Sequence, residues 1–215
     1  HSALSFRHFV LGTVAIFIYV GVEVGIPNFA NLFMTSPEIN IDPTIAGSVV
    51  GTYWFLMMIG RLCGASIGAK VSSRAMLTVV STVGIALVLG AIFCADNILV
   101  NMPVFKSDIS FGFAQVPVNV MLLILCGLCT SVMWGGIFNL AVEGLGKYTA
   151  AASGLFMVMV CGGGILPLIQ GGVADFAGFL NSYWVIALGL AYILFYAAIG
   201  SKNVNTDIPT DDYEA

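Results

Sequence analysis

Six long apolar runs divide this sequence, and each is long enough to cross a lipid bilayer. A transmembrane helix needs about 20 mostly apolar residues, because the hydrocarbon core of a bilayer is about 30 Å thick. Hydrophobic residues make up 59% of the chain and charged residues only 8%, whereas about 25% of a soluble domain is charged. The sequence therefore predicts an all-α membrane protein with six transmembrane helices. The predicted spans are 9–34, 45–69, 75–95, 117–142, 150–174 and 179–199.

The basic residues of the loops predict the orientation of the chain. In a six-span zigzag, five of them fall on one side of the membrane and Lys106 on the other. Because cytoplasmic loops carry the excess of lysine and arginine, we expect a multi-pass protein of the cell membrane with both termini in the cytoplasm. The loop 96–116 is then outside and long enough to fold over the outer face. The five basic residues are Arg7, Lys70, Arg74, Lys147 and Lys202.

The net charge of -4 comes largely from residues 201–215, which are expected to form an acidic cytoplasmic tail. The rest of the chain is close to neutral, which argues against nucleic acid as a partner. The chain begins His1-Ser2 without a signal-peptide pattern, so the start is expected to be processed or cut from a longer protein.

Glu23 stands inside the first apolar run, close to Gly21, Gly25 and Pro27. A carboxylate at that depth costs roughly 2.5–3.5 kcal/mol on insertion scales, so it is usually kept for a solute or proton path. Irregular backbone at membrane depth is tolerated where it is buried or lines a cavity. These residues predict a polar interior and favour a carrier.

The polar residues are unevenly distributed among the runs. The first, second, fourth and fifth hold nearly all the glycine, proline and amide side chains, whereas the third and sixth contain no charged residue. We expect the third and sixth spans to be peripheral. The order polar, polar, plain occurs twice, as it would in a carrier built from two three-helix inverted repeats.

Three motif matches favour structure over chemistry. Gly64–Gly68 fits the G-x-S-x-G pattern of serine hydrolases, but the histidines, His1 and His8, lie before the first span, so no base is within reach. The C-x-x-C at 126–129 lies inside an apolar span and has no second pair for zinc. The glycines at 162–164 have no lysine or hydroxyl residue placed for a phosphate. We therefore expect no metal, no cofactor and no enzymatic activity.

Several segments resemble, in order, glucose/galactose transporters related to fucose permease, a family of the major facilitator superfamily. Gly135-Gly136 departs from that family, which usually has a proline there, and Gly164 stands in place of an alanine. The similar segments are Tyr19-Val-Gly-Val-Glu-Val-Gly25 (seventh span), Tyr53-Trp54 with Gly60-Arg-Leu-Cys-Gly64 (eighth), Ile137–Gly146 (tenth) and Ser153–Asp175 (eleventh).

The resemblance implies that the chain is the carboxy-terminal six-helix bundle of a twelve-span carrier. The missing amino-terminal six-span half, which in the family carries acidic groups for proton coupling, would be its partner. The first and fourth runs would line the central cavity.

Sugar recognition requires carboxylates and amides for the hydroxyl groups and aromatic faces for the ring. Glu23, Asn28 and Asn31 fall within an arc of about 140° on a regular helix, although the two amides also suit interhelical hydrogen bonds. Trp134 lies well inside the fourth run, where it could stack on a sugar. The predicted substrate-binding residues are Glu23, Asn28, Asn31, Tyr53, Trp134 and Gln170, with Trp54 as a further candidate.

A second group of residues is expected to form the cytoplasmic gate and the helix packing. Arg61 lies about 13 Å deeper than Lys70 along a helix, and we expect it to approach Glu143 or another carboxylate near the cytoplasmic ends. Snorkelling of Arg61 to lipid headgroups is the alternative. The predicted gating and structural residues are Gly60, Arg61, Gly64, Arg74, Asn139, Glu143 and Pro167.

These inferences predict secondary active transport of a hexose or deoxyhexose, such as glucose, galactose or fucose, by alternating access. The expected partners are the sugar, a coupling proton or sodium ion, the lipid bilayer and the amino-terminal half. Two alternatives stay open, a compact six-span solute channel and a structural membrane subunit. A water- or ion-selectivity motif would support the channel, and none appears in the sequence. A structural subunit would not require the polar interior.

Overall fold

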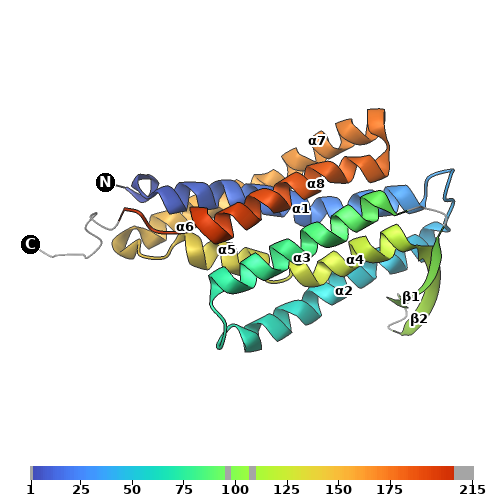
Figure 1. Cartoon of the computed structure of the whole chain (residues 1–215), viewed down its shortest axis with the longest axis horizontal. Coiled ribbons are helices and arrows are strands. Elements are labelled where there is room, and N and C mark those ends of the chain that lie inside the picture. The colour runs from blue at the N-terminus through green and yellow to red at the C-terminus, as the bar shows by residue number, and fades with distance from the viewer. Residues whose placement is uncertain (1, 95–97, 107–109, 206–215) are drawn as a thin grey trace, which may run out of the picture.

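Six helical segments run lengthwise through an elongated bundle (Figure 1). The computed structural model describes residues 2–94, 98–106 and 110–205. Within these residues, six segments are long and apolar enough to cross a membrane, and the predicted six-span architecture is confirmed. The predicted acidic tail, 201–215, lies outside the described residues from position 206 onward.

Three of the six spans are single helices and three are interrupted. The first three spans are α1 (Arg7–Met34), α2 (Pro43–Ile67) and α3 (Ser73–Phe93). The fourth consists of α4 (Val118–Thr130) and α5 (Met133–Ala141). The fifth comprises η2 (Gly146–Tyr148), α6 (Thr149–Val158), η3 (Met159–Cys161) and α7 (Gly162–Ala177). The sixth is α8 (Phe179–Phe195) with the π-helical turn η4 (Tyr196–Gly200), and a short turn η1 (Ala3–Ser5) precedes α1.

Local sequence signals account for several helix ends. Asp42 accepts a hydrogen bond from the backbone N–H of Thr44 and is followed by Pro43 in the first turn of α2, where a missing N–H is harmless. Ser72 caps α3 in the same way, through the N–H of Ala75. Gly178, with φ of +94°, permits the sharp turn between α7 and α8.

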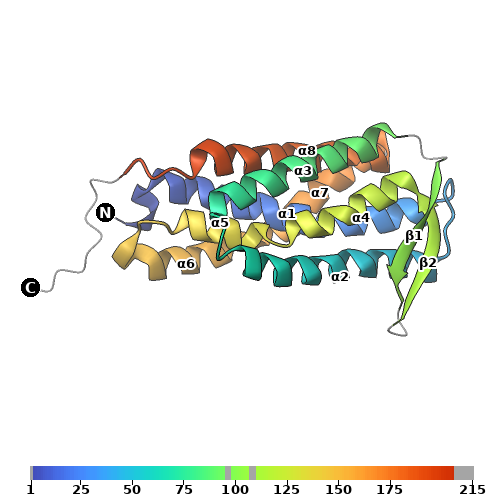
Figure 2. The same cartoon turned by 60° about the horizontal axis from the view of Figure 1, so that its bottom comes forward.

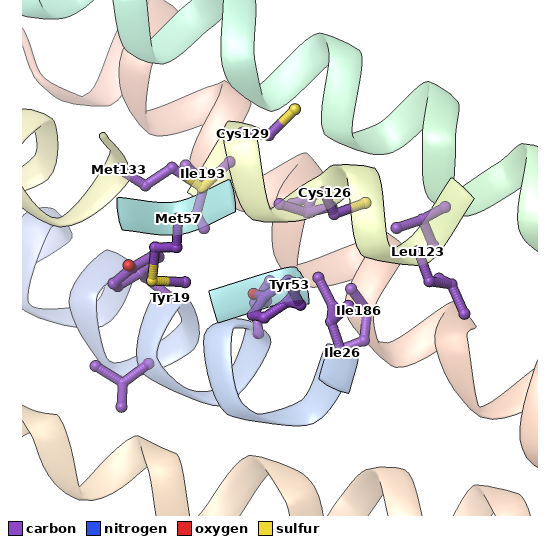
Figure 3. Close-up of a cluster of buried hydrophobic side chains, with 14 of the residues drawn as sticks. Tyr19, Ile26, Tyr53, Met57, Leu123, Cys126, Cys129, Met133, Ile186 and Ile193 are labelled. Atoms are coloured by element: carbon purple, nitrogen blue, oxygen red, sulfur yellow. The ribbon is translucent and has the colours of Figure 1, made fainter. Parts of the chain in front are cut away.

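The hydrophobic core surrounds α1, which packs against α4, α5, α7 and α8. A cluster of fully or nearly fully buried side chains joins α1, α4, α5 and α8 to α2 (Figure 3). The helices α3 and α8 pack against each other along one side of the bundle (Figure 2). Figure 3 labels Tyr19, Ile26, Tyr53, Met57, Leu123, Cys126, Cys129, Met133, Ile186 and Ile193 within this cluster.

Glycines bring α1 and α7 into close contact. A Cβ atom at Gly162 would collide with the backbone carbonyl oxygen of Phe17, and one at Gly21 would collide with Leu166. Small residues thus allow the two backbones to approach, as in other membrane helix pairs. The helix continues through Pro167, and the irregular turn of this span lies earlier, at η3.

A β-hairpin occupies much of the predicted loop 96–116. Strands β1 (Leu99–Phe105) and β2 (Phe111–Pro117) pair antiparallel, with Met102 opposite Ala114. The hairpin lies at the end of the bundle opposite the first turn of α1 (Figure 2). A long loop was expected here, but its two strands were not predicted from the sequence.

Candidate functional site

The fourth span is interrupted at Ser131 and Val132, between α4 and α5. Gly60 and Gly64 of α2 lie directly against this break, because a Cβ atom at either position would collide with Ser131 or Val132 respectively. Gly60 and Gly64 therefore let the second span approach an irregular backbone segment. Arg61, next to Gly60, is placed at the same level.

Arg61 and Glu23 form an ion pair between α2 and α1. Nη2 of Arg61 lies 3.5 Å from Oε1 of Glu23, and its Nε donates to the backbone oxygen of Ser131 at 3.4 Å. The Arg61 side chain is 55% exposed and the Glu23 side chain 17% exposed. Among the described residues this is the single ion pair within 4 Å. Charged groups at membrane depth usually face a bundle interior or a water-filled path, and this pair lies at the open edge of the bundle.

Two buried tyrosines hold the backbone around this pair. The hydroxyl of Tyr53 donates to the carbonyl oxygen of Glu23 at 3.1 Å and lies 3.1 Å from Oγ1 of Thr130. The hydroxyl of Tyr19 donates to the carbonyl oxygen of Thr130 at 3.0 Å. Both tyrosines are fully buried, and Figure 3 shows them within the cluster of buried side chains. Their hydrogen bonds connect α1, α2 and α4 beside the ion pair.

A groove of about 560 Å³ adjoins the pair and is lined by α2, α3 and α5. Arg61 contributes to its wall, and so do Trp134 and Asn139. The Trp134 ring stacks on Phe138 with centroids 5.4 Å apart and meets the edge of Phe156 at 5.7 Å. One side of the Trp134 ring is thus occupied by protein.

The structure separates the remaining predicted substrate-binding residues. Asn28 is exposed and Asn31 half-buried, farther along α1 than Glu23 and away from the pair. Gln170 is 1% exposed, its Nε2 donates to Oγ of Ser182 at 3.3 Å, and its Oε1 lies against Gly25. Gln170 therefore packs α7 against α8 and α1 and does not join the Glu23–Arg61 group.

Arg61 was expected to approach Glu143 or another carboxylate near the cytoplasmic ends, and its partner in the structure is Glu23 of α1. The bond from Arg61 to the carbonyl of Ser131 directs the guanidinium toward α1, where Glu23 is the available carboxylate. Glu143 lies after α5, and its backbone oxygen instead pairs with Nε2 of the buried His8 at 2.7 Å.

Two other predicted gate residues connect the helix ends. Nε of Arg74, in the first turn of α3, donates to Oγ of Ser201 at 3.2 Å. Nδ2 of Asn139 donates to Oγ of Ser73 at 3.4 Å. These contacts tie the start of α3 to the ends of the sixth and fourth spans.

Sequence reasoning did not select Tyr19, Thr130 and Ser131 as parts of this site. Tyr19 precedes Glu23 by one helical turn, so the spacing could have indicated that the two lie close together. The carbonyl oxygens of Thr130 and Ser131 accept bonds because the helix is interrupted after Thr130, and no proline or glycine at positions 130–132 indicates that interruption. The described residues contain no group of three or more His, Cys, Asp or Glu side chains placed to hold a metal ion.

Comparison with a solved structure identifies the fold. The chain superimposes on a crystal structure of the major facilitator superfamily transporter FucP in the outward conformation, with a TM-score of 0.76 and 23% sequence identity. The match covers 92% of this chain and 43% of FucP. The fold is therefore that of half of a major facilitator superfamily transporter.

Sequence relatives place the chain more narrowly. It is 32% identical to a glucose/galactose transporter of Brucella abortus over 203 residues, and 32% identical to a putative glucose/galactose transporter of Helicobacter pylori over 206 residues. Each match covers 94% of this chain but only 44% and 46% of the respective relative. The L-fucose-proton symporter of Escherichia coli is 23% identical over 197 residues. No family model matches the chain.

This multi-pass membrane protein is thus a homologue of glucose/galactose transporters in the major facilitator superfamily, as the sequence resemblance predicted. The chain spans less than half the length of these relatives.

Proposed function

We propose that the chain is the carboxy-terminal half of a sugar carrier of the cell membrane, with both termini in the cytoplasm. The carrier moves a hexose or deoxyhexose by alternating access, coupled to a cation. The printed names of the relatives support glucose, galactose or fucose as substrate, and the fucose-proton symporter supports a proton over sodium as the coupling ion.

The observation that carries this proposal is the Glu23–Arg61 pair. It joins the first and second spans beside a break in the fourth, where the exposed side of Arg61 is available to a solute. A sugar hydroxyl can donate to the Glu23 carboxylate and accept from the guanidinium, so a sugar can replace part of the ion pair with hydrogen bonds of its own.

The partner of this half is proposed to be an amino-terminal six-span bundle. The fifth span leaves large apolar side chains uncovered, including Leu168 at 75% and Phe176 at 83% exposed. Asn28 is exposed on α1 as well. Exposing the amide to hydrocarbon costs free energy, whereas a second bundle could cover the amide and bury the apolar groups.

Uptake of radiolabelled galactose, glucose and fucose into liposomes, with an imposed proton or sodium gradient, tests the proposal. We expect uptake when an amino-terminal half is supplied with the chain, and none with the 215 residues alone. Uptake by the chain alone would favour a compact channel or a homodimer.

The variant Glu23→Gln tests the role of the carboxylate in the same assay. It keeps the shape and the hydrogen-bonding capacity but removes titration, so we expect altered affinity or pH dependence with unchanged membrane insertion. Transport that is unchanged in both Glu23→Gln and Glu23→Ala contradicts this role.

A further inference from the structure

The two faces of the β1–β2 hairpin have different surroundings, since one is buried against the bundle and the other is exposed. Its inner face packs on α2 and α4 and is almost fully buried, whereas its outer face is exposed and carries large apolar side chains together with Asn101 and Gln115. Phe113 is 74% exposed and Phe111 68% exposed, and Leu99 on the same face is 54% exposed. The buried inner residues are Met102, Val104, Ala114 and Val116.

Specific contacts fix the hairpin to α2. The backbone N–H of Phe105 donates to Oγ1 of Thr52 at 2.9 Å. The Phe105 ring stacks on Phe55 of α2, with ring centroids 4.8 Å apart and an angle of 4° between the planes. Phe111 meets the edges of both rings, at 5.5 Å and 5.4 Å. The hairpin is therefore a packed part of the fold, and these ring contacts hold Phe111 against it.

The hairpin is attached to the side of α2 that faces away from the ion pair. Thr52 and Arg61 are nine residues apart, which places them about 180° from each other around a helix that turns 100° per residue. Arg61 reaches toward α1 and Glu23, so a second bundle that closes over that site covers the opposite side of α2. The surface beside the hairpin is left for a different partner.

Exposed aromatic side chains continue around the same end of the bundle. Phe93 at the end of α3 is 71% exposed, and Trp184 near the start of α8 is 40% exposed. Their rings meet edge to face, with centroids 5.6 Å apart. Tryptophan and tyrosine residues at the ends of membrane spans form belts at the headgroup level, and Trp184 is a residue of this kind.

We propose that the β1–β2 hairpin is a membrane-interface anchor, whose outer face of Phe111, Phe113 and Leu99 lies among the lipid headgroups and upper acyl chains. The unpaired edges of a two-stranded sheet require water, which places the hairpin at the interface and not in the hydrocarbon core. Lys106, exposed at the end of β1, can reach a lipid phosphate from that depth. A cavity of about 220 Å³ under the hairpin, lined by Phe55, Met121 and Leu125 among others, offers apolar space to an acyl chain.

Site-specific photo-crosslinking in the membrane tests the partner directly. The chain, expressed with its amino-terminal half, is reconstituted in vesicles of phosphatidylcholine and phosphatidylglycerol with p-benzoylphenylalanine in place of Phe113. We expect phospholipid adducts, detected by mass spectrometry of the chain. The same substitution at exposed Phe93 is the positive control, and buried Phe156 is the negative control. Crosslinks from position 113 to polypeptide, or no adduct where position 93 gives one, would overturn the proposal.

A second variant, Phe113→Trp, tests the same surface with a natural side chain. In vesicles of brominated phosphatidylcholine, we expect extra quenching of tryptophan fluorescence relative to the unmodified chain, strongest when bromine lies near the headgroup. Equal quenching of the variant and the unmodified chain would show that position 113 does not contact lipid, and the anchor would be refuted.

Discussion

The hydroxyl of Tyr53 on α2 lies 3.1 Å from the carbonyl oxygen of Glu23 on α1, so a fully buried side chain of one span holds the backbone of another beside its carboxylate. The same hydroxyl meets Oγ1 of Thr130 on α4. Three spans are thus joined at one oxygen atom, and the geometry of the ion pair depends on that junction.

Tyr53→Phe removes this junction with little change of shape. We expect a loss of about 1 kcal/mol in the free energy of unfolding, the usual net value of a hydrogen bond. Thermal unfolding in detergent measures it. In a double-mutant cycle with Thr130→Val, the two losses should not add, and the coupling should exceed about 0.5 kcal/mol. Additive losses would show that the two hydroxyls act separately.

The Glu23–Arg61 pair is expected to matter more for transport than for stability. Because Arg61 is more than half exposed, solvent screens the ion pair. The pair is therefore expected to contribute no more than about 1 kcal/mol to the free energy of unfolding. We expect Arg61→Gln and Glu23→Ala to lower sugar uptake by about tenfold or more, equivalent to about 1.4 kcal/mol of binding free energy. Uptake and the unfolding midpoint should be measured on the same preparations. If uptake falls only in those variants whose unfolding midpoint also falls, the pair has a structural role.

Gly162 and Gly164 provide a matched test of the contact between α1 and α7. A methyl group at Gly162 would meet the carbonyl oxygen of Phe17, whereas the space around Gly164 is open. We expect Gly162→Ala to destabilise the bundle by about 1–3 kcal/mol, the cost of overpacking. Gly164→Ala should be neutral or stabilise by up to about 1 kcal/mol, because alanine favours the helix. Equal effects in thermal unfolding would contradict the packing.

Asn119 is expected to be a buried cap that connects α3 to α4. Its Nδ2 donates to the carbonyl oxygens of Ala91 at 2.6 Å and Cys94 at 2.8 Å, at the end of α3. Asn119→Ala leaves these acceptors unsatisfied and should cost about 1–3 kcal/mol. The control is Asn181→Ala, whose amide makes an exposed bond to Ala177 and should change stability by less than about 0.5 kcal/mol. Similar losses from both variants would contradict the role of Asn119.

The apolar runs predicted the six spans because membrane thickness imposes length and composition on any helix that crosses it. Glu23 was selected for the same reason, since an ionisable group at that depth is rarely without function. The sequence did not predict the partner of Arg61. Helical depth placed this arginine toward the cytoplasmic ends, but its direction is set by the carbonyl of Ser131, a tertiary contact that no local pattern encodes.

The hairpin was missed because its sequence does not alternate regularly between apolar and polar residues. Phe111-Gly-Phe-Ala-Gln-Val116 places apolar side chains on both faces, because one face meets α2 and α4 and the other is exposed. The run therefore lacks the apolar–polar alternation that indicates a half-buried strand. The position of Gln170 on α7 likewise did not reveal that its side chain contacts Ser182 and Gly25.

The interruption of the fourth span gives two backbone oxygens to side chains of other helices. In a continuous helix the carbonyls of Thr130 and Ser131 would accept bonds from residues four positions later, but here they accept from Tyr19 and Arg61. A change in tilt between α4 and α5 must therefore alter the hold on both side chains. Because Arg61 is bonded both to the carbonyl of Ser131 and to Glu23, a change in the angle at this break would also alter the geometry of the ion pair.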